Sequence, residues 1–218
     1  IPSAEKVRFG KNGSDCASAS IRLARSYTKK DHIICIGYHG WEDWYIGSTS
    51  RSKGVPSAVK KLTHPANYNN LESVNRILNK YKNNVAALIM EPANFVNHDK
   101  SYFRKLQKIL KIHKTLLIFD EICTGFRFAN GGAQQLFNVK PDLSVFGKSM
   151  ANGMPISALV GKSKIMKHFN DVFFSTTFGG ETLSIAAAIA TINKIKSKGV
   201  VKNIWKKGEK IKKFVRLE

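Results

Sequence analysis

The sequence predicts an α/β fold with a mostly parallel sheet covered by helices on both faces. Apolar runs such as 85–90 and 116–119 are continuous rather than alternating, as in strands that are buried on both faces. Segments of ten or more residues with helical spacing separate these runs, which is the pattern of βα units. The sequence shows no internal repeat and no glycine-, proline- or serine-rich linker, so we expect one domain.

The expected elements alternate along the chain. A short strand at 7–9 is followed by Asn12-Gly13-Ser14-Asp15, which supplies capping residues for a helix to about Tyr27. Continuous apolar runs predict further strands at 32–36, 85–90, 116–119, 143–146 and 157–160. Helical spacing predicts further helices at 71–81, 99–113, 182–196 and 201–214. Loops past the carboxyl ends of parallel strands meet at one edge, where such sheets carry their chemistry.

Length and composition limit the class of protein. The 218 residues suffice for one large domain or two small ones, and 43% of them are hydrophobic. No apolar run approaches the roughly 18–20 residues of a membrane helix, which predicts a soluble protein. The chain opens on Ile1-Pro2-Ser3 without a methionine or a signal peptide, so we expect a fragment or a processed form.

Cysteine usage predicts the compartment. Cys16, Cys35 and Cys123 have neither metal-ligand nor CxxC spacing, which favours a reducing environment, most simply the cytoplasm. All three lie in apolar stretches, which is typical of buried structural thiols.

The charge is strongly basic, with 36 Lys and Arg residues against 15 Asp and Glu, for a net charge of +21. Such a balance is found in proteins that bind nucleic acids or membrane surfaces, and a nucleic-acid-binding α/β protein therefore stays an alternative. It would bind DNA or RNA with a steep salt dependence. The lysines, however, are scattered along the expected helices, with a dense cluster only at 202–213, and we favour solvated helix faces.

Several polar clusters follow expected strands. Gly13 and Ser14 open a helix, where free N–H groups bind anions, although an ordinary helix cap has the same sequence. Tyr38-His39-Gly40 offers an aromatic ring that could stack on a planar ligand or pack in the core. The aromatic run 41–45 indicates a cavity lining or a subunit contact.

Three more clusters lie farther along the chain. Asp120 and Glu121 end an apolar strand, and a buried carboxylate there needs a cation or a donor. A protonated heterocyclic nitrogen would serve, and Arg127 could form an ion pair with Glu121. Lys148 is either an amine for Schiff-base formation or one more solvated charge. Residues 175–180, rich in hydroxyls and glycine, are compatible with phosphate binding.

The order of these clusters is the most specific signal. The segment Leu117-Ile118-Phe119-Asp120-Glu121-Ile122-Cys123-Thr124-Gly125-Phe126-Arg127, followed by matching segments at 132–137, 140–143, 147–148 and 152–155, resembles the signature region of class III aminotransferases. Segments 7–15, 21–25, 38–40 and 91–92 fit the same family in order. The chain is most similar to glutamate-1-semialdehyde 2,1-aminomutase-like members. The resemblance implies a three-layer fold type I domain that binds pyridoxal 5'-phosphate (PLP).

The resemblance also assigns roles to residues. Lys148 would form the Schiff base with PLP and move the substrate proton, and Asp120 would pair with the ring nitrogen. Ile122 and Tyr38 would pack on the two faces of the ring, and His39 belongs to the same cofactor-binding set.

The phosphate of the cofactor has its own expected partners. Gly13, Ser14 and Asp15 would cradle it, and Thr177 would reach the phosphate of a neighbouring subunit, which implies a homodimer with shared sites. Asp15 replaces the glutamate that is usual in the family and is one methylene shorter. Cys123 stands where many relatives carry glutamine or methionine.

The resemblance divides the chain and leaves two related activities open. Residues 1–200 correspond to the large PLP-binding domain, and residues 201–218 to the start of a helix that links it to a smaller domain. We expect PLP-dependent transfer of an amino group on a small amino or keto substrate, most simply an intramolecular aminomutase reaction. The alternative is an aminotransferase acting on an amino acid or a keto-sugar.

Overall fold

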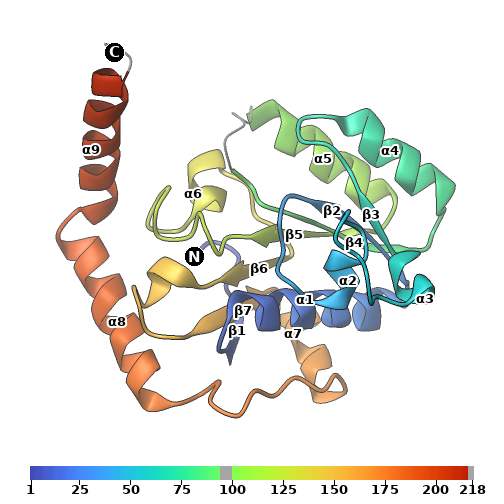
Figure 1. Ribbon diagram of the computed structural model, residues 1–218, viewed down its shortest axis with the longest axis horizontal. Helices are drawn as coiled ribbons and strands as arrows, with labels where there is room; N and C mark the ends of the chain where they lie inside the picture. Colours follow the sequence, from blue (N-terminus) through green and yellow to red (C-terminus); the bar gives the residue numbers. More distant parts are fainter. Residues whose placement is uncertain (94–99, 216–218) are drawn as a thin grey trace.

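A seven-stranded sheet lies between layers of helices in the computed structural model, which describes residues 1–93 and 100–215 (Figure 1). The strands are β1 (Lys6–Gly10), β2 (His32–Ile36), β3 (Thr63–Pro65), β4 (Val85–Met90), β5 (Leu116–Asp120), β6 (Leu143–Phe146) and β7 (Ser157–Gly161). Their order across the sheet is β1-β7-β6-β5-β4-β2-β3. Strand β7 runs antiparallel to both of its neighbours, and the other neighbouring pairs are parallel. The predicted mostly parallel sheet is therefore confirmed.

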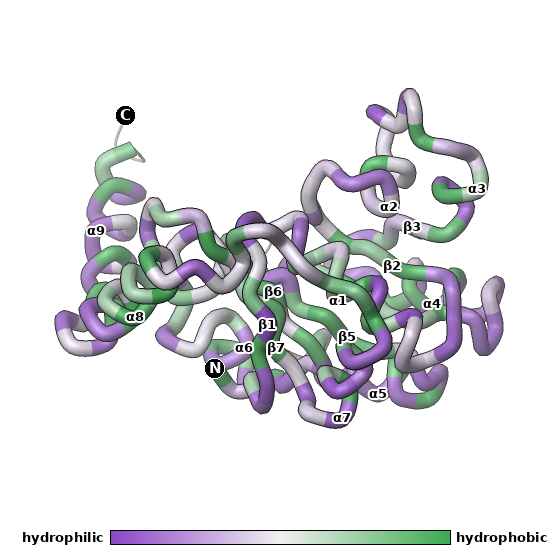
Figure 2. The backbone as a smooth tube through the Cα atoms, turned by 90° about the horizontal axis from the view of Figure 1, so that it is seen from below, coloured by the Kyte–Doolittle hydropathy of each residue, from purple (hydrophilic) through white to green (hydrophobic). Residues whose placement is uncertain are grey.

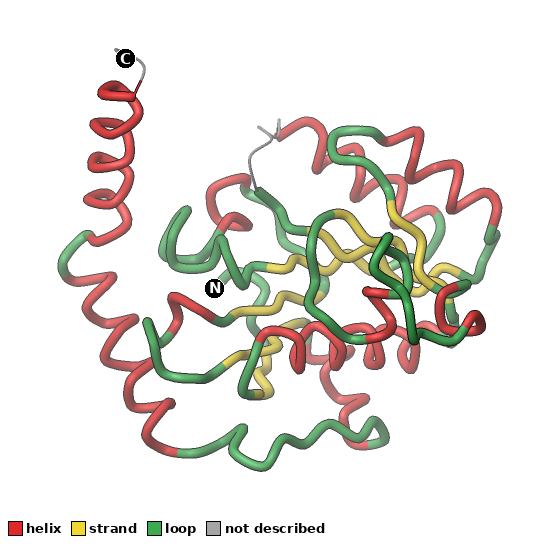
Figure 3. Tube along the Cα trace, in the orientation of Figure 1, coloured by secondary structure: helices red, strands yellow, loops and turns green. Residues whose placement is uncertain are grey.

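Helices connect the strands, and the long ones lie where the sequence predicts them. The α-helices are α1 (Gly13–Thr28), α2 (Asp43–Ile46), α3 (Ser57–Lys60), α4 (Leu71–Lys80), α5 (Lys100–Ile112), α6 (Ala133–Phe137), α7 (Ser163–Met166), α8 (Thr182–Ser197) and α9 (Val200–Val215). Two 3₁₀ turns, η1 (Lys148–Met150) and η2 (Lys167–Asn170), complete them (Figure 3). The sequence missed β3 and the short helices α2, α3, α6 and α7. The expected start of one helix at Asp99 lies outside the described residues.

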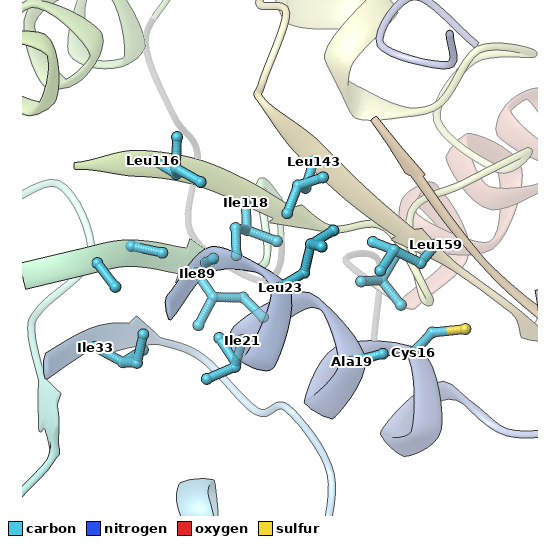
Figure 4. Packing of buried hydrophobic residues seen from close by; sticks show 14 of the residues in the cluster. Cys16, Ala19, Ile21, Leu23, Ile33, Ile89, Leu116, Ile118, Leu143 and Leu159 are labelled. Carbon is cyan, nitrogen blue, oxygen red and sulfur yellow. The ribbon is translucent and has the colours of Figure 1, made fainter. Parts of the chain in front are cut away.

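Each face of the sheet has its own apolar core. Helix α1 covers one face, where Ile21 and Leu23 pack among Ile33, Ile118 and other strand residues (Figure 4). Helices α4 and α5 cover the opposite face, where the core includes apolar residues of β2, β4 and β5 (Figure 1). All residues of β4 and β5 are buried, as the continuous apolar runs 85–90 and 116–119 predict, and β5 is largely green in Figure 2. The two cores fix the strand ends that carry the polar clusters.

The carboxyl-terminal helices extend from the sheet (Figure 1). Helix α8 contributes Ala188 and Ile195 to a third core, together with Phe146 and Val160 of the sheet. Helix α9 has no buried residue, and Trp205 holds it to the body by donating from Nε1 to the carbonyl of Arg127 at 2.9 Å. No helix in residues 1–93 and 100–215 has the length and apolar composition that a membrane crossing requires.

The three thiols differ in burial, which corrects one expectation from the sequence. Cys16 and Cys35 are buried, and burial raises their pKa values to about 12 and about 11. Cys123 is only half-buried and lies at the edge of the sheet, so it does not behave as a core thiol. Strand β5 ends at Asp120, and Cys123 lies in the turn that follows, outside the apolar interior.

Candidate active site

A cavity of about 610 Å³ lies at the carboxyl edge of the parallel strands. Because β2, β4, β5 and β6 are parallel, the residues that follow Ile36, Met90, Phe119 and Phe146 emerge at the same edge. The cavity is lined by Lys11, Asn12, Gly13, Ser14, Tyr38, His39, Gly40, Trp41, Glu91, Asp120, Ile122, Cys123, Lys148, Gly153, Met154, Pro155 and Ile156. Its volume suits a ligand the size of an organic cofactor.

The amino end of α1 forms one wall of the cavity. Asn12 caps the helix, its side chain accepting from the backbone N–H of Asp15, and the Asp15 carboxylate accepts from the backbone N–H groups of Lys11 and Asn12. The first N–H groups of a helix have no acceptor within the helix, and Gly13 and Ser14 bring theirs to the cavity wall. This end of α1 is therefore suited to an anion.

Two glycines allow the close packing of this wall. A Cβ on Gly13 would lie 2.5 Å from Cδ1 of Ile122, so glycine lets the helix end approach the residue after β5. Gly40 has a φ of 106°, and a Cβ there would overlap the hydroxyl of Ser14. The amino end of α1, Ile122 and the loop after β2 thus pack closely because neither glycine has a side chain.

Asp120 and His39 form a buried pair on the floor of the cavity. Asp120 Oδ2 lies 2.9 Å from His39 Nδ1, and Asp120 Oδ1 accepts from the backbone N–H of Ile122 at 3.1 Å. His39 is 1% exposed and Asp120 is 3% exposed. An ionised carboxylate only accepts hydrogen bonds, so the ring proton belongs on Nδ1 when Asp120 is charged. His39 Nε2 is buried without a hydrogen-bond partner in the part of the chain that the structure describes.

Lys148 begins the turn that follows β6. Its φ of 40° lies in the left-handed region, and its Nζ donates to Cys123 Sγ at 3.1 Å. Both residues line the cavity, but Lys148 is exposed, so the partly apolar pocket that the sequence suggests for this lysine is open to solvent. The amine can meet a carbonyl group in the cavity, which is the geometry that Schiff-base formation needs.

The loop after β2 supplies an exposed aromatic ring. Tyr38 is 62% exposed, and Glu91 Oε2 holds its backbone N–H at 3.1 Å while also accepting from the hydroxyl of Tyr68 at 3.2 Å. Burial is the first cause that raises the pKa of Tyr68, followed by the charge of Glu91, which keeps this hydroxyl a donor. The Tyr38 ring at the cavity is thus held by the hydrogen bond of its backbone and by an edge contact with the ring of buried Tyr45, whose centroid lies 5.7 Å away.

The aromatic run after this loop divides between cavity and core. Trp41 lines the cavity and is 71% exposed, as expected for a cavity lining. Tyr45 is buried, and Trp44 packs against the core while its Nε1 donates to Ser18 Oγ at 2.9 Å. Of the three aromatic residues of the run, Trp41 therefore faces the cavity and the other two belong to the core.

Lys11 closes the cavity on the side of α8. Its Nζ donates to the carbonyl of Pro155 at 2.8 Å and to Glu181 Oε1 at 2.7 Å. The hydrogen bond from Lys11 is the main cause that lowers the pKa of Glu181 to about 2. This lysine joins the α1 wall to the segment before β7 and to the start of α8, and its amine is occupied by those contacts.

Glu121 turns away from the cavity, and here the structure corrects the sequence. The predicted ion pair with Arg127 is absent, because the guanidinium of Arg127 donates to the carbonyl of Cys123. The Glu121 carboxylate instead accepts from Thr124 Oγ1, from the backbone N–H groups of Ala133 and Gln134, and from Gln134 Nε2. Glu121 is therefore a buried cap of α6 and not part of the site.

Seven of the nine residues predicted for the site line one cavity. They are Gly13, Ser14, Tyr38, His39, Asp120, Ile122 and Lys148. Asp15 is not among the lining residues because its carboxylate is used in the helix cap. Thr177 is exposed in the loop before α8, and neither it nor the rest of 175–180 lines the cavity. The sequence did not assign Lys11 or Trp41 to the cofactor site; the aromatic run 41–45 did indicate a cavity lining, which Trp41 provides, whereas a single lysine in a loop gives no signal that could have placed Lys11.

Residues from four strand ends, far apart in the sequence, thus line one cavity. The family model described as aminotransferase class-III matches residues 1–217. The chain belongs to the class III aminotransferase family. The 3-aminobutyryl-CoA aminotransferase of Cloacimonas acidaminovorans is 40% identical over 96% of this chain and 52% of its own length. A glutamate-1-semialdehyde 2,1-aminomutase of Francisella tularensis is 37% identical over 97% of this chain and 53% of its own length.

Solved structures of other proteins have the same fold. The PLP internal aldimine form of the FumI protein from Sphingopyxis sp. MTA144 matches with a TM-score of 0.84 and 30% identity, over 90% of this chain and 49% of that one. The ornithine aminotransferase from Toxoplasma gondii matches with a TM-score of 0.87 at 21% identity, over 98% of this chain and 54% of that one. The predicted fold type I domain is confirmed, and PLP is the cofactor that the FumI protein carries in this fold. The chain spans about half the length of the curated relatives it matches.

Proposed function

We propose that this protein binds PLP in the cavity at the carboxyl edge of the sheet and transfers amino groups with it. The observation that carries the proposal is the placement of the exposed Lys148 amine in the same cavity as the buried His39–Asp120 pair. An amine, a carboxylate and a helix amino end are the three groups that the aldehyde, the ring nitrogen and the phosphate of this cofactor require.

The cavity passes a test of fit that uses only its own residues. The Asp120 carboxylate is buried without a lysine or arginine partner among the described residues, so a protonated ring nitrogen would supply the missing positive charge. Gly13 and Ser14, in the first turn of α1, line the cavity and offer the amino end of the helix to an anion. Ile122 and Tyr38 offer the two surfaces between which a flat ring would lie.

Each residue has a definite task in this proposal. When bound, PLP supplies an electron-withdrawing ring that stabilises negative charge on the substrate carbon. Lys148 would hold the cofactor through its Nζ and, once released, would take and return the substrate proton. Asp120 would keep the ring nitrogen protonated, and His39 would hold Asp120 in position through Nδ1. Ser14 would add its hydroxyl to the phosphate site.

Within the family we favour the aminomutase type of reaction, in which the amino group returns to the neighbouring carbon of the same molecule. The likeness to glutamate-1-semialdehyde 2,1-aminomutase supports this choice. A test supplies the protein and PLP with glutamate 1-semialdehyde and no added keto acid. Conversion to the isomeric amino ketone supports the aminomutase, whereas a reaction that starts only after a keto acid is added refutes it.

An aminotransferase is the second candidate, because the 3-aminobutyryl-CoA aminotransferase is 40% identical. For either activity we also propose a homodimer with Thr177 directed to the partner, a small amino or keto substrate, and a cytoplasmic location consistent with three free thiols. Sedimentation of the purified protein tests the dimer, which a monomer with a working cofactor site would refute. We further propose that residues 1–200 form the cofactor domain and that 201–218 begin a linking helix.

The cofactor site can be tested directly. The protein is mixed with PLP, reduced with borohydride and digested, and the phosphopyridoxyl group is located by mass spectrometry. We expect one dominant adduct on Lys148 that is lost in Lys148→Ala and kept in Lys164→Ala, a matched lysine outside the cavity. Adducts spread evenly over surface lysines of the folded chain would refute the proposed site.

A further inference from the structure

Asparagine followed by glycine is a chemically labile pair, and it occurs at three places in this chain. The sites are Asn12-Gly13, Asn130-Gly131 and Asn152-Gly153. Because glycine has no side chain, its backbone nitrogen can reach the side-chain carbonyl carbon of the asparagine before it. That attack requires a free asparagine amide and a glycine nitrogen that can move toward it. The fold therefore decides which of the three sites reacts.

Hydrogen bonds hold the first two sites. Asn12 caps α1, its Oδ1 accepting from the backbone N–H of Asp15 at 3.1 Å and its Nδ2 donating to Asp15 Oδ1 at 2.9 Å. At the second site Gly131 is buried, and its backbone N–H donates to Gln135 Oε1 at 2.6 Å. The amide that would be attacked is thus fixed at one site, and the attacking nitrogen is fixed at the other.

Neither kind of contact holds Asn152-Gly153. Both residues are exposed, and among the described residues neither the Asn152 side chain nor the Gly153 nitrogen has a hydrogen-bond partner. A Cβ added to Gly153 would meet nothing within 4 Å, so the turn has open space on this side. Asn152 and Gly153 have φ values of 45° and 124°, as in a tight exposed turn. Asn152 is therefore the asparagine that the fold leaves free to react.

The same turn carries Lys148 and reaches the cavity, which Gly153 and Lys148 both line. The backbone N–H of Asn152 donates to the carbonyl of Lys148 at 3.1 Å, and the backbone N–H of Met154 donates to the carbonyl of Ala151 at 3.4 Å. The second of these bonds spans the link between Asn152 and Gly153, and the first ties Asn152 to Lys148. The position of Lys148 therefore depends on the length of that link.

We propose that Asn152 deamidates spontaneously and that the isoaspartate so formed reduces the uptake of cofactor at Lys148; the second part rests on the proposed function. The Gly153 nitrogen bonds to the side-chain carbonyl carbon of Asn152, and its proton passes to the NH₂ group, which leaves as ammonia. Water then opens the cyclic imide. Cleavage beside the side-chain carbonyl gives aspartate, and cleavage beside the original backbone carbonyl gives isoaspartate. In total one water is consumed and one ammonia is released.

Isoaspartate lengthens the turn, because its backbone runs through the former side-chain carbon and contains one additional methylene. The longer link changes the spacing between the Ala151 carbonyl and the Met154 N–H. The turn must shift to absorb it, and Lys148 moves with its hydrogen-bonded partner at position 152. A displacement of about 1 Å costs a reacting group up to about 100-fold in rate.

The modification is tested first without cofactor. The folded chain is aged at mildly alkaline pH, and the conversion of amide to acid at each asparagine is followed by peptide mass spectrometry, with isoaspartate counted by methyltransferase labelling. We expect Asn152 to react at least about tenfold faster than Asn12 or Asn130, which react only after local opening of the fold. In urea the three rates should converge. Equal rates in the folded chain, or the same ranking in urea, would overturn the proposal.

Cofactor uptake is then measured within one aged sample that is mixed with PLP and reduced with borohydride. Trypsin does not cleave at a modified Lys148 or before Pro141, so a labelled chain gives peptide 128–162 and an unlabelled chain gives peptide 149–162. Both peptides contain residue 152. We expect isoaspartate to be roughly tenfold rarer in the labelled peptide, because a displaced Lys148 loses its alignment with the cofactor. Equal shares in the two peptides would refute the effect on uptake.

Three variants identify the cause. Asn152→Asp adds the charge without the methylene and should take up PLP as fresh wild type does; a loss as large as that of isoaspartate would refute the role of the longer backbone. Asn152→Gly removes the amide and tolerates the φ of 45°, so its uptake should survive ageing. Asn130→Ser is the matched control and should lose uptake on ageing as wild type does. Loss of uptake in aged Asn152→Gly would assign the effect to another residue and overturn the proposal.

The outcomes separate this inference from the proposed function. Fresh chain that forms no adduct on Lys148 refutes the proposed function together with the effect of isoaspartate on uptake. The rates at the three asparagines are measured without cofactor, so they decide the deamidation independently of that result. Fast deamidation of Asn152 with equal labelling of both forms refutes the effect on uptake alone and leaves the proposed function standing.

Discussion

Replacement of Glu121 is expected to destabilise the fold more than replacement of any residue in the cavity wall. The carboxylate is 0% exposed, and it accepts four hydrogen bonds, two on each oxygen. Glu121→Ala leaves those four donors without an acceptor, two of them backbone N–H groups at the start of α6. Each buried donor that loses its acceptor costs about 1–3 kcal/mol. Water that enters the enlarged site satisfies part of the four donors, so we expect a total loss of about 4–5 kcal/mol in the free energy of unfolding.

Glu121→Gln isolates the role of charge. One oxygen remains and can keep one pair of donors, while the new NH₂ group faces the other pair, so we expect a loss of about 2–3 kcal/mol. Burial raises the pKa of Glu121 from its ordinary value of 4.5, while its hydrogen bonds lower it. Because its pKa is raised, the Glu121 carboxyl group holds its proton more tightly in the folded state than in the unfolded state. Its contribution to the free energy of unfolding of the wild type is therefore complete below pH 4.5 and decreases as pH rises. The difference between wild type and Glu121→Gln should therefore be largest at acid pH.

Urea unfolding followed by circular dichroism, repeated across pH, measures these differences in the free energy of unfolding. The conservative Asp142→Asn, whose carboxylate also accepts hydrogen bonds but at a more accessible position, serves as the control. If Glu121→Ala costs less than about 1 kcal/mol, the four donors find other partners and the reasoning fails. A gap between wild type and Glu121→Gln that widens as pH rises would refute the direction of the pKa shift.

Three further perturbations follow from contacts around the cavity and at the opposite edge. Lys11→Met removes the main cause of the low pKa of Glu181, so the pKa of Glu181, about 2 in the wild type, should rise toward 4.5 in a carboxyl NMR titration; an unchanged value would refute the ion pair. Burial lowers the pKa of His64 from 6.5 to about 4, so its stabilising contribution should be lost as pH falls from 6.5 to 4, and His64→Gln should flatten that part of the stability curve; equal curves would contradict it. Gly40→Ala forces a side chain into a φ of 106° against Ser14, and we expect a loss of about 1–3 kcal/mol in thermal unfolding together with weaker PLP uptake, whereas Gly54→Ala, at a φ of 87° with open space, should lose stability but keep uptake.

The sequence could predict the sheet and the strand ends because both depend on local pattern. The run 85–90 is apolar at every position, and such a strand is buried on both faces in the structure as predicted. Asp120 and Lys148 could be placed at one edge because each follows a strand of a parallel sheet. The short helices could not be predicted, since four or five residues such as 43–46 and 163–166 give no helical period.

Contacts between segments that are distant in the chain could not be predicted from the sequence. The pairing of His39 with Asp120 depends on the distance between the loop after β2 and the last residue of β5, and nothing in either segment specifies it. The same holds for Lys11, whose partners Pro155 and Glu181 are far away in the chain. For Glu121, charge complementarity suggested Arg127, but the helix α6 that folds against it offers backbone donors at closer range. The choice of partner is thus set by tertiary packing.

The reversed direction of β7 has a consequence for the lysine. Strand β6 ends at Phe146, two residues before Lys148, and the chain returns to the sheet as β7 at Ser157, with Phe146 paired to Ala158 across the two strands. Lys148 therefore belongs to a closed hairpin connection anchored at both ends, not to an open crossover that leads away to a helix. A change in β7 that shifts its register by one residue would displace the whole connection and move the Lys148 amine from its contact with Cys123. Residues of β7 that lie outside the cavity therefore help to fix the position of the Lys148 amine.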